Sequence, residues 1–135
     1  MALVLVPVAA DRLDAMWPHV EGLIRKALAR SGKDTPEEMR AAIAKKERQL
    51  WLAWERGVGA EAVAVTGISE HALMRVAVIY ICIGRQREYW IEFLAKLEDW
   101  ARAEGCRRIE ALARPGLEKV LKGYRKTHVM LEKAL

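Results

Sequence analysis

The chain has 135 residues, of which 53% are hydrophobic and 30% are charged, and its net charge is +5. This length fits one domain with its own hydrophobic core, and the composition excludes a disordered or linker-rich chain. The basic residues are spread from Arg12 to Lys133 and form no block, so the charge does not favour nucleic acid as a partner. We therefore expect a single domain that covers residues 1–135.

The N-terminal part predicts a strand followed by two helices. Residues 2–8 are apolar and β-branched, which predicts a strand, and this run is too short to span a membrane. Apolar residues recur at helical spacing over residues 11–31 and predict a first helix. Thr35, Pro36 and Glu38 then form a helix start signal, so a second, shorter helix should follow.

The rest of the chain predicts more strands and a long helix. QLWLAWER and EAVAVTGIS are rich in β-forming residues and are separated by GVGA, which predicts a hairpin. ALMRVAVIYICIG is almost wholly apolar, which indicates a strand covered on both faces. A long helix is predicted from Gln86 to Gly105. CRRIEALA predicts a strand, RPGLEKVLKGY a short helix and THVMLEKAL a final strand.

The predicted fold class is α/β (α+β) with one mixed central sheet. The order of elements is β-α-α-β-β-β-α-β-α-β. The fourth strand, the long helix and the fifth strand form a right-handed crossover, so those two strands should be parallel. The hairpin strands should be antiparallel.

The two cysteines do not predict a disulfide or a metal site. Cys82 and Cys106 are far apart in the sequence, and no further Cys or His lies at a ligand spacing from either of them. The pattern indicates buried thiols in a reducing compartment, which favours the cytoplasm.

The order of elements resembles the GNAT acetyltransferase superfamily, whose members bind acetyl-CoA where two parallel strands splay apart. The resemblance covers nearly the whole chain. It also rests on WARAEGCRRIEALARPG and on VLKGYRKTHVMLEKAL, with its Gly123-Tyr124 pair. The cofactor-binding residues that the resemblance implies are Ile81, Ile83, Gly84, Arg85, Gln86 and Arg87.

The implied cofactor loop departs from the family pattern. Of the family's glycines only Gly84 remains, and Glu88 adds a negative charge near where the phosphates would lie. Arg85 and Arg87 either bind phosphate through their guanidinium groups or are solvated residues of the first helical turn. The loop therefore resembles a degenerate cofactor loop.

The catalytic residues that the resemblance implies are also incomplete. The family's general acid is commonly a tyrosine four residues before the Gly-aromatic turn, and Lys119 stands there in this chain. Tyr124 belongs to the turn and is expected to be a packing residue. Glu70, His71 and Tyr80 are the nearest candidates for a general base. The alternative is that Glu70 and His71 are turn residues and that Tyr80 is a half-buried strand aromatic.

Two functions follow from the resemblance. One is an acetyl-CoA-dependent N-acetyltransferase in which a small-molecule amine attacks the thioester directly. The other is a GNAT-like structural or accessory protein with reduced or absent activity. The Trp-rich start and WARAEGC also resemble small GNAT-like proteins of tailed bacteriophages and prophages. Such an accessory module would act in the bacterial cytoplasm or be carried in the virion. Its partners would be other phage or virion proteins or a second copy of the chain, and the missing tyrosine and glycines favour this second function.

Overall fold

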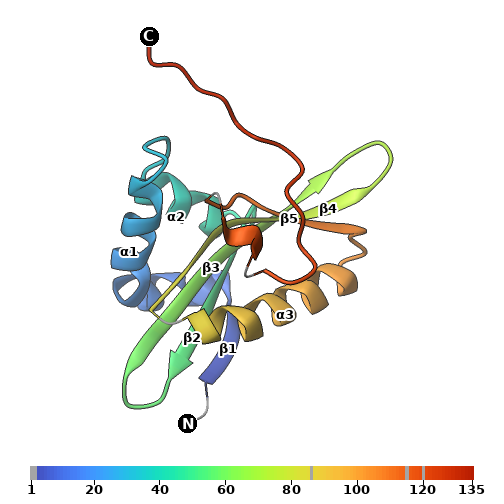
Figure 1. Cartoon of the computed structure of the whole chain (residues 1–135). Coiled ribbons are helices and arrows are strands. Elements are labelled where there is room, and N and C mark those ends of the chain that lie inside the picture. Colours follow the sequence, from blue (N-terminus) through green and yellow to red (C-terminus); the bar gives the residue numbers. More distant parts are fainter. Residues whose placement is uncertain (1–2, 86, 115, 120) are drawn as a thin grey trace.

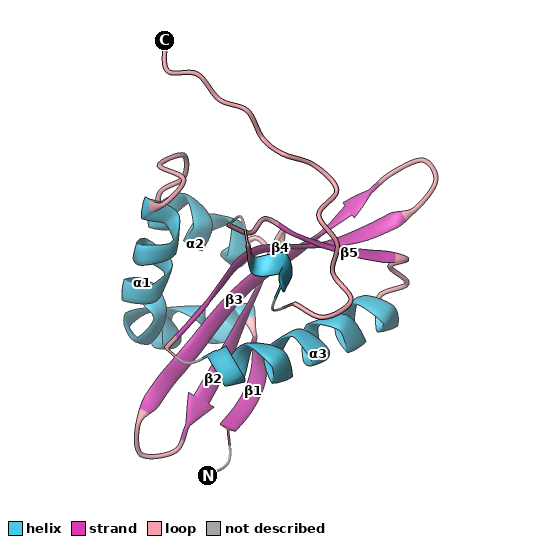
Figure 2. Ribbon diagram, in the orientation of Figure 1, coloured by secondary structure: helices cyan, strands magenta, loops and turns pink. Residues whose placement is uncertain are grey.

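A twisted five-stranded sheet forms the centre of the protein, with two helices on one face and one on the other (Figures 1 and 2). The computed structural model describes residues 3–85, 87–114, 116–119 and 121–135, and the side chains of residues 87–91 lie outside this description. The strands are β1 (Leu3–Val8), β2 (Gln49–Glu55), β3 (Gly59–Glu70), β4 (Arg75–Gly84) and β5 (Arg108–Ala111). The helices are α1 (Leu13–Ala29), α2 (Pro36–Ala44) and α3 (Arg87–Ala103), with single 3-10 turns η1 (Ala10–Arg12) and η2 (Leu117–Lys119).

The strands lie in the order β1-β2-β3-β4-β5. The first four pair antiparallel, and β4 pairs with β5 in parallel. α3 makes the crossover between the two parallel strands, on one face of the sheet (Figure 2). The mixed sheet and its parallel pair, both predicted from the sequence, are confirmed.

The predicted start of α2 is also confirmed. The backbone N–H of Glu38 donates to Thr35 Oγ1 at 3.1 Å, and the backbone N–H of Thr35 donates to Glu38 Oε1 at 3.2 Å. These reciprocal bonds satisfy two donors that have no partner inside the helix. Pro36 takes the first helical position, where a missing N–H costs nothing.

The core has two parts, one on each face of the sheet. On one face, α1 packs Val20 and Ile24 against the apolar side chains of β2, β3 and β4. On the other, α3 packs Phe93 and Leu97 against small residues such as Ala64, which let the helix approach the sheet closely. Burial of these side chains is the main force that holds the helices on the sheet.

The C-terminal part corrects the predicted order. Among the described residues of segment 114–124, where a helix was predicted, only the single turn η2 forms, and no strand forms over residues 121–135. Gly116 and Gly123 adopt φ values of 95° and 84°, which end helical geometry on both sides of a segment too short to be a stable helix. THVMLEKAL is extended but has no neighbouring strand to pair with in its own chain, and it projects away from the body (Figure 1).

Candidate functional site

β4 and β5 pair over only part of their length. The parallel ladder joins Val76–Ile79 to Arg108–Ala111, and the N–H of Leu112 then donates to the carbonyl of Ile79 at 3.4 Å. Beyond this point β5 has ended, whereas β4 continues to Gly84. Among the described residues, the last part of β4 therefore has no strand beside it on the β5 side. This gap opens toward the start of α3.

A β-bulge marks the point where the strands part. Val65 pairs with Ile81 and Thr66 pairs with Ile79, so Tyr80 is the extra residue in β4. In a regular strand, successive backbone N–H groups point alternately toward the two neighbouring strands. The extra residue shifts this alternation by one position.

The shifted alternation decides which backbone groups face the gap. The N–H of Arg85 donates to the carbonyl of Glu61 in the neighbouring chain segment at 3.0 Å. By alternation the N–H groups of Ile81 and Ile83 also point toward β3, and those of Cys82 and Gly84 point into the gap. Gly84 was predicted as a cofactor residue and Cys82 was not. Cofactor binding by Ile81 and Ile83 stays a prediction, although their N–H groups face the other strand.

Tyr80 lies across β3 on the face that α1 and α2 cover. A Cβ atom on Gly67 would lie only 2.9 Å from Tyr80 Cε2, and the guanidinium carbon of Arg48 lies 3.9 Å from the ring centroid. The ring is thus held between a glycine and a cation. One signal in the sequence indicates this contact, because a glycine inside a strand often marks a close approach.

Glu70 ends β3 and His71 lies in the turn before β4, so both are at the end of β4 that is far from Gly84. Glu70 Oε1 is 3.1 Å from Arg75 Nε, and the ring of His71 is 2.9 Å from Ser69 Oγ. A strand advances about 3.3 Å per residue, so Arg75 is about 13 Å along β4 from Ile79, where the strands part. The structure therefore does not bring Glu70 and His71 together with Tyr80, and their role as a general base stays a prediction.

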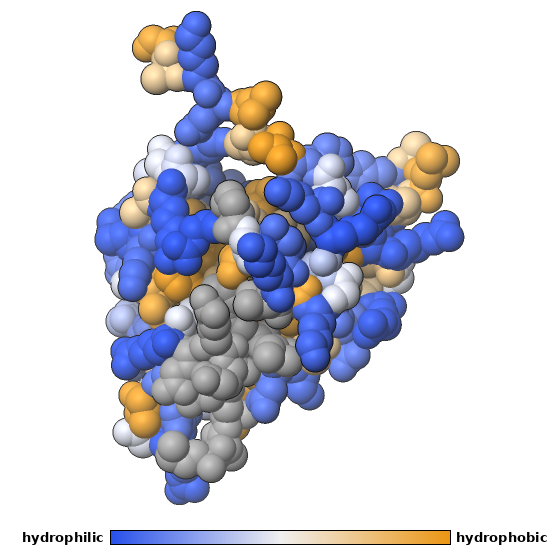
Figure 3. All heavy atoms as spheres, in the orientation of Figure 1, coloured by the Kyte–Doolittle hydropathy of each residue, from blue (hydrophilic) through white to orange (hydrophobic). Residues whose placement is uncertain are grey.

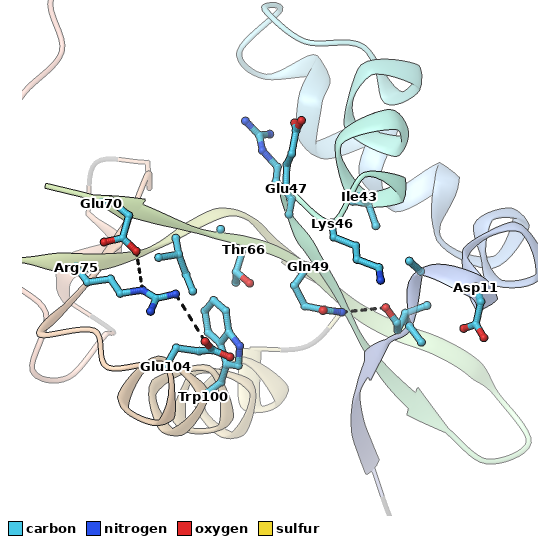
Figure 4. Close-up of a pocket in the computed structure, with 16 residues that line it drawn as sticks. Asp11, Ile43, Lys46, Glu47, Gln49, Thr66, Glu70, Arg75, Trp100 and Glu104 are labelled. Carbon is cyan, nitrogen blue, oxygen red and sulfur yellow. Dashed lines mark hydrogen bonds and ion pairs between the residues drawn. The ribbon is translucent and has the colours of Figure 1, made fainter.

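An open groove of about 1110 Å³ lies beside the last residues of β3 (Figure 4). It is bordered by the end of β1, the loop after α2 and the end of α3. Gln49 Nε2 donates to the carbonyl of Val8 at 2.9 Å on one side, and Arg75 lies between Glu70 and Glu104 on the other. Gly67 is part of the lining, so the groove reaches the backbone over which Tyr80 lies.

The chain that follows β5 returns over the α3 face of the sheet. Leu121 and Tyr124 pack with Cys82 in the cluster under α3, and the hydroxyl of Tyr124 donates to Glu98 Oε2 at 2.9 Å. Burial raises the pKa of Cys82 to about 12, and burial followed by the bond to Glu98 raises the pKa of Tyr124 above its ordinary value. Tyr124 is confirmed as a packing residue.

Only some of the residues predicted to bind the cofactor's phosphates lie in the described part of the chain. The side chain of Arg85 is exposed and can reach an anion in solution, whereas its backbone N–H donates to Glu61. Gln86 lies outside the described residues, and Arg87 begins α3 with a side chain that is not described. The first turn of a helix offers unpaired backbone N–H groups to an anion. The described residues contain neither a cluster of metal-binding side chains nor a helix able to cross a membrane.

No protein-family model and no curated protein matches the chain. Solved structures match its fold. An aminoglycoside acetyltransferase from an uncultured soil metagenomic sample, solved with sisomicin, has a TM-score of 0.73 and 10% identity over 98% of this chain and 96% of its own. A GNAT family acetyltransferase from Staphylococcus aureus has a TM-score of 0.68 and 12% identity over 100% of both chains.

A third match is an acetyltransferase from Trypanosoma brucei, with a TM-score of 0.66 and 13% identity over 99% of this chain and 100% of its own. At such identities the likeness concerns the fold, and the function must be argued from the site. The mixed sheet and the α3 crossover are features that the resemblance predicted, and the matches share the fold over nearly the whole chain. The chain has the GNAT fold.

Proposed function

We propose that this protein binds acetyl-CoA and transfers its acetyl group to an amine. The observation that carries the proposal is the unpaired edge of β4, where the N–H groups of Cys82 and Gly84 face a gap that ends at the start of α3. An unpaired strand edge binds an extended ligand that offers amide groups, in the way that it would bind a further strand.

The chain's own groups fit the parts of the cofactor. The pantetheine arm carries amides that match the edge at Cys82 and Gly84. The diphosphate matches the first turn of α3 and the exposed guanidinium of Arg85. Bound acetyl-CoA would supply an acetyl group that is activated as a thioester. The contribution of the protein would be to hold that group and the amine in line, and such positioning can supply several kcal/mol of the barrier.

The acceptor amine would lie near Tyr80. Among the three candidate bases, this residue alone stands where β4 and β5 part, and its ring borders Gly67 in the groove. The groove is large enough for a small molecule and carries carboxylates, including Glu47 and Glu104. A protonated amine can bind there before it loses its proton and attacks.

Calorimetric titration with acetyl-CoA and CoA tests cofactor binding. We expect binding in the micromolar to sub-millimolar range, and we expect Arg85→Ala to weaken it by about tenfold or more because the phosphate loses a charged partner. Arg30→Ala is the matched control, since Arg30 is an exposed arginine at the end of α1, which packs on the face of the sheet opposite α3. No heat of binding at millimolar ligand would refute the proposal.

Turnover separates the enzyme from the alternative function. We expect CoA release from acetyl-CoA when a panel of primary amines is supplied, and we expect Tyr80→Phe to lower kcat if the hydroxyl helps to remove the proton. The alternative, a non-catalytic module of a phage or prophage, is supported by Lys119 at the position of the family's acid. Cofactor binding without CoA release for any amine would favour that alternative.

A further inference from the structure

Arg48 is an arginine of the groove whose guanidinium group is held in place from two sides. Hydrophilic side chains make up most of the described surface seen in Figure 3, where water solvates their charges. Arg48, by contrast, is partly buried and lines the groove. Its guanidinium carbon lies 3.9 Å from the centroid of the Tyr80 ring, and its Nη1 donates to Met39 Sδ at 3.3 Å. These two contacts fix the position of the positive charge.

Arg40 shows how a similar arginine has its charge paired within the chain. Its guanidinium carbon lies 5.2 Å from the centroid of the Trp17 ring, and its Nη2 lies 2.7 Å from Asp14 Oδ1. Arg48 has no such carboxylate among the residues that the structure describes. Because a partly buried charge without an opposite charge is unfavourable, an anion bound in the groove would stabilise Arg48.

The open edge of the Arg48 guanidinium group suits a carboxylate. Nη1 is engaged with a sulfur atom, and Nε and Nη2 have no acceptor within the described part of the chain. Neither of these two nitrogens is a buried atom without a hydrogen-bond partner, so both reach solvent in the groove. They lie on one edge of the planar group and can donate two parallel hydrogen bonds to the two oxygens of one carboxylate.

The groove around Arg48 carries charges of both signs. Lys46 and Glu47 precede Arg48 in the loop after α2 and line the groove with it, and Lys46 extends toward β1 in Figure 4. At the other end of the groove, two glutamates already balance the charge of Arg75. A ligand with both an ammonium and a carboxylate group therefore meets complementary charges near Arg48, whereas a purely cationic amine is repelled by Lys46 and Arg48.

We infer that the acceptor is a free α-amino acid and that Arg48 binds its α-carboxylate. The inference rests on the proposed function, which places the acceptor amine near Tyr80. One carbon atom separates the amine of an α-amino acid from its carboxylate, so a carboxylate at Arg48 holds the amine close to the ring on which Arg48 lies. Arg48 also rejects amines that lack a carboxylate, because its charge then stays unpaired.

The reaction on such an acceptor yields an N-acetylamino acid and CoA. The amine nitrogen forms a bond to the acetyl carbon, and the thioester C–S bond breaks. The sulfur leaves as a thiolate, and the proton that the amine loses balances its charge. Arg48 takes no part in these bond changes and acts by binding and positioning the amino acid.

Calorimetric titration of the wild-type protein with matched ligands tests the inference without any substitution. The common amino acids are screened at millimolar concentration, and each one that binds is compared with its amide and with the amine that lacks the carboxyl group. We expect the amino acid to bind at least about tenfold more tightly than either, because both lack the charge that pairs with Arg48. No binding by any amino acid, or equal binding by the amide, would overturn the inference.

Arg48→Met separates recognition of the carboxylate from support of the Tyr80 ring. Methionine keeps an unbranched side chain beside the ring and removes the charge and the donors. For the amino acid that binds best, we expect this substitution to lower the affinity by about tenfold or more and to leave the affinity for the amide unchanged. An equal loss for both ligands would overturn the inference, because Arg48 would then act only through Tyr80.

Arg40→Met is the matched control, since Arg40 also lies over an aromatic ring but is not part of the groove lining. This variant should bind both ligands as the wild type does. Circular dichroism spectra and Tm values show whether each variant is folded. If Arg48→Met does not fold, Arg48→Lys takes its place and should lose most of the preference for the amino acid, because lysine lacks the two parallel donors.

Turnover separates a failure of this inference from a failure of the proposed function. CoA release from acetyl-CoA with simple amines but with no amino acid would overturn the inference and leave the proposed function standing. Tight binding of amino acids that depends on Arg48, without CoA release, would support the carboxylate site and refute the acetyl transfer.

Discussion

Gly67 is the position where one added methyl group should have the largest effect on the bulge. A Cβ there would lie 2.9 Å from Tyr80 Cε2, whereas carbon atoms in contact prefer about 3.5–4.0 Å. The ring would have to move by roughly 0.6–1 Å, and the guanidinium carbon of Arg48, 3.9 Å from the ring centroid, limits the space for that movement. We expect Gly67→Ala to lower the free energy of unfolding by about 1–3 kcal/mol, the usual range for an overpacked site.

Urea unfolding in a double-mutant cycle measures this effect and its cause. Tyr80→Ala removes the ring, so in that background the added methyl meets only the backbone oxygen of Glu47 at 3.6 Å, an ordinary contact, and Gly67→Ala should cost little or nothing. The difference between the two backgrounds is the coupling energy, which we expect to equal most of the cost in the wild type. An equal cost in both backgrounds would show that the strain does not come from Tyr80.

Three further predictions concern stability, each measured by thermal or urea unfolding. The pKa of Cys82 is raised to about 12 from 9.0, so its contribution to stability is full below pH 9 and is lost as the pH rises toward about 12. Over this pH range the Cys82 thiol should lower the free energy of unfolding by about 1.4 kcal/mol per pH unit, and Cys82→Ala should abolish that part of the pH dependence. A pH dependence that Cys82→Ala leaves unchanged would contradict the raised pKa of Cys82. Thr35→Ala removes the cap of α2 and should cost about 1 kcal/mol, with a cost near zero arguing against the capping box. Gly22 is an exposed residue of α1, and Gly22→Ala should raise the free energy of unfolding by about 0.5–1 kcal/mol, since an added Cβ meets nothing within 4 Å. A lower free energy of unfolding would show that the added methyl group clashes with a neighbour.

The elements that the sequence predicted well are those with local signals. The capping residues Thr35 and Glu38 act within one turn of helix, and the glycines of GVGA act within one hairpin. The almost wholly apolar sequence of β4 indicates that both faces of the strand are buried, as expected for a strand in the middle of a sheet. The order of these elements was enough to predict the mixed sheet.

The candidate site was harder to predict because it depends on pairing between distant residues. Nothing in the sequence around Tyr80 indicates a bulge, which arises from the register of β4 against β3. Without the bulge, the N–H groups of Ile81 and Ile83 would face the gap, as the resemblance implied. For the same reason the final strand was predicted but is absent from the described chain, since the sequence shows a tendency to form a strand and does not show which edge it pairs with.

One inserted residue in β4, Tyr80, determines which backbone groups of this strand face the proposed cofactor site. It stands next to Ile79, where β5 stops pairing with β4, and it turns the side chain of Tyr80 over Gly67 toward the groove. It also moves the free N–H groups onto Cys82 and Gly84, which lie between that point and the start of α3. An extended ligand on this edge would then have its anionic end at the helix start and its other end beside Tyr80. Cofactor binding should therefore depend on the backbone of β4 and on Arg85, and the choice of acceptor on the groove that Gly67 lines next to Tyr80.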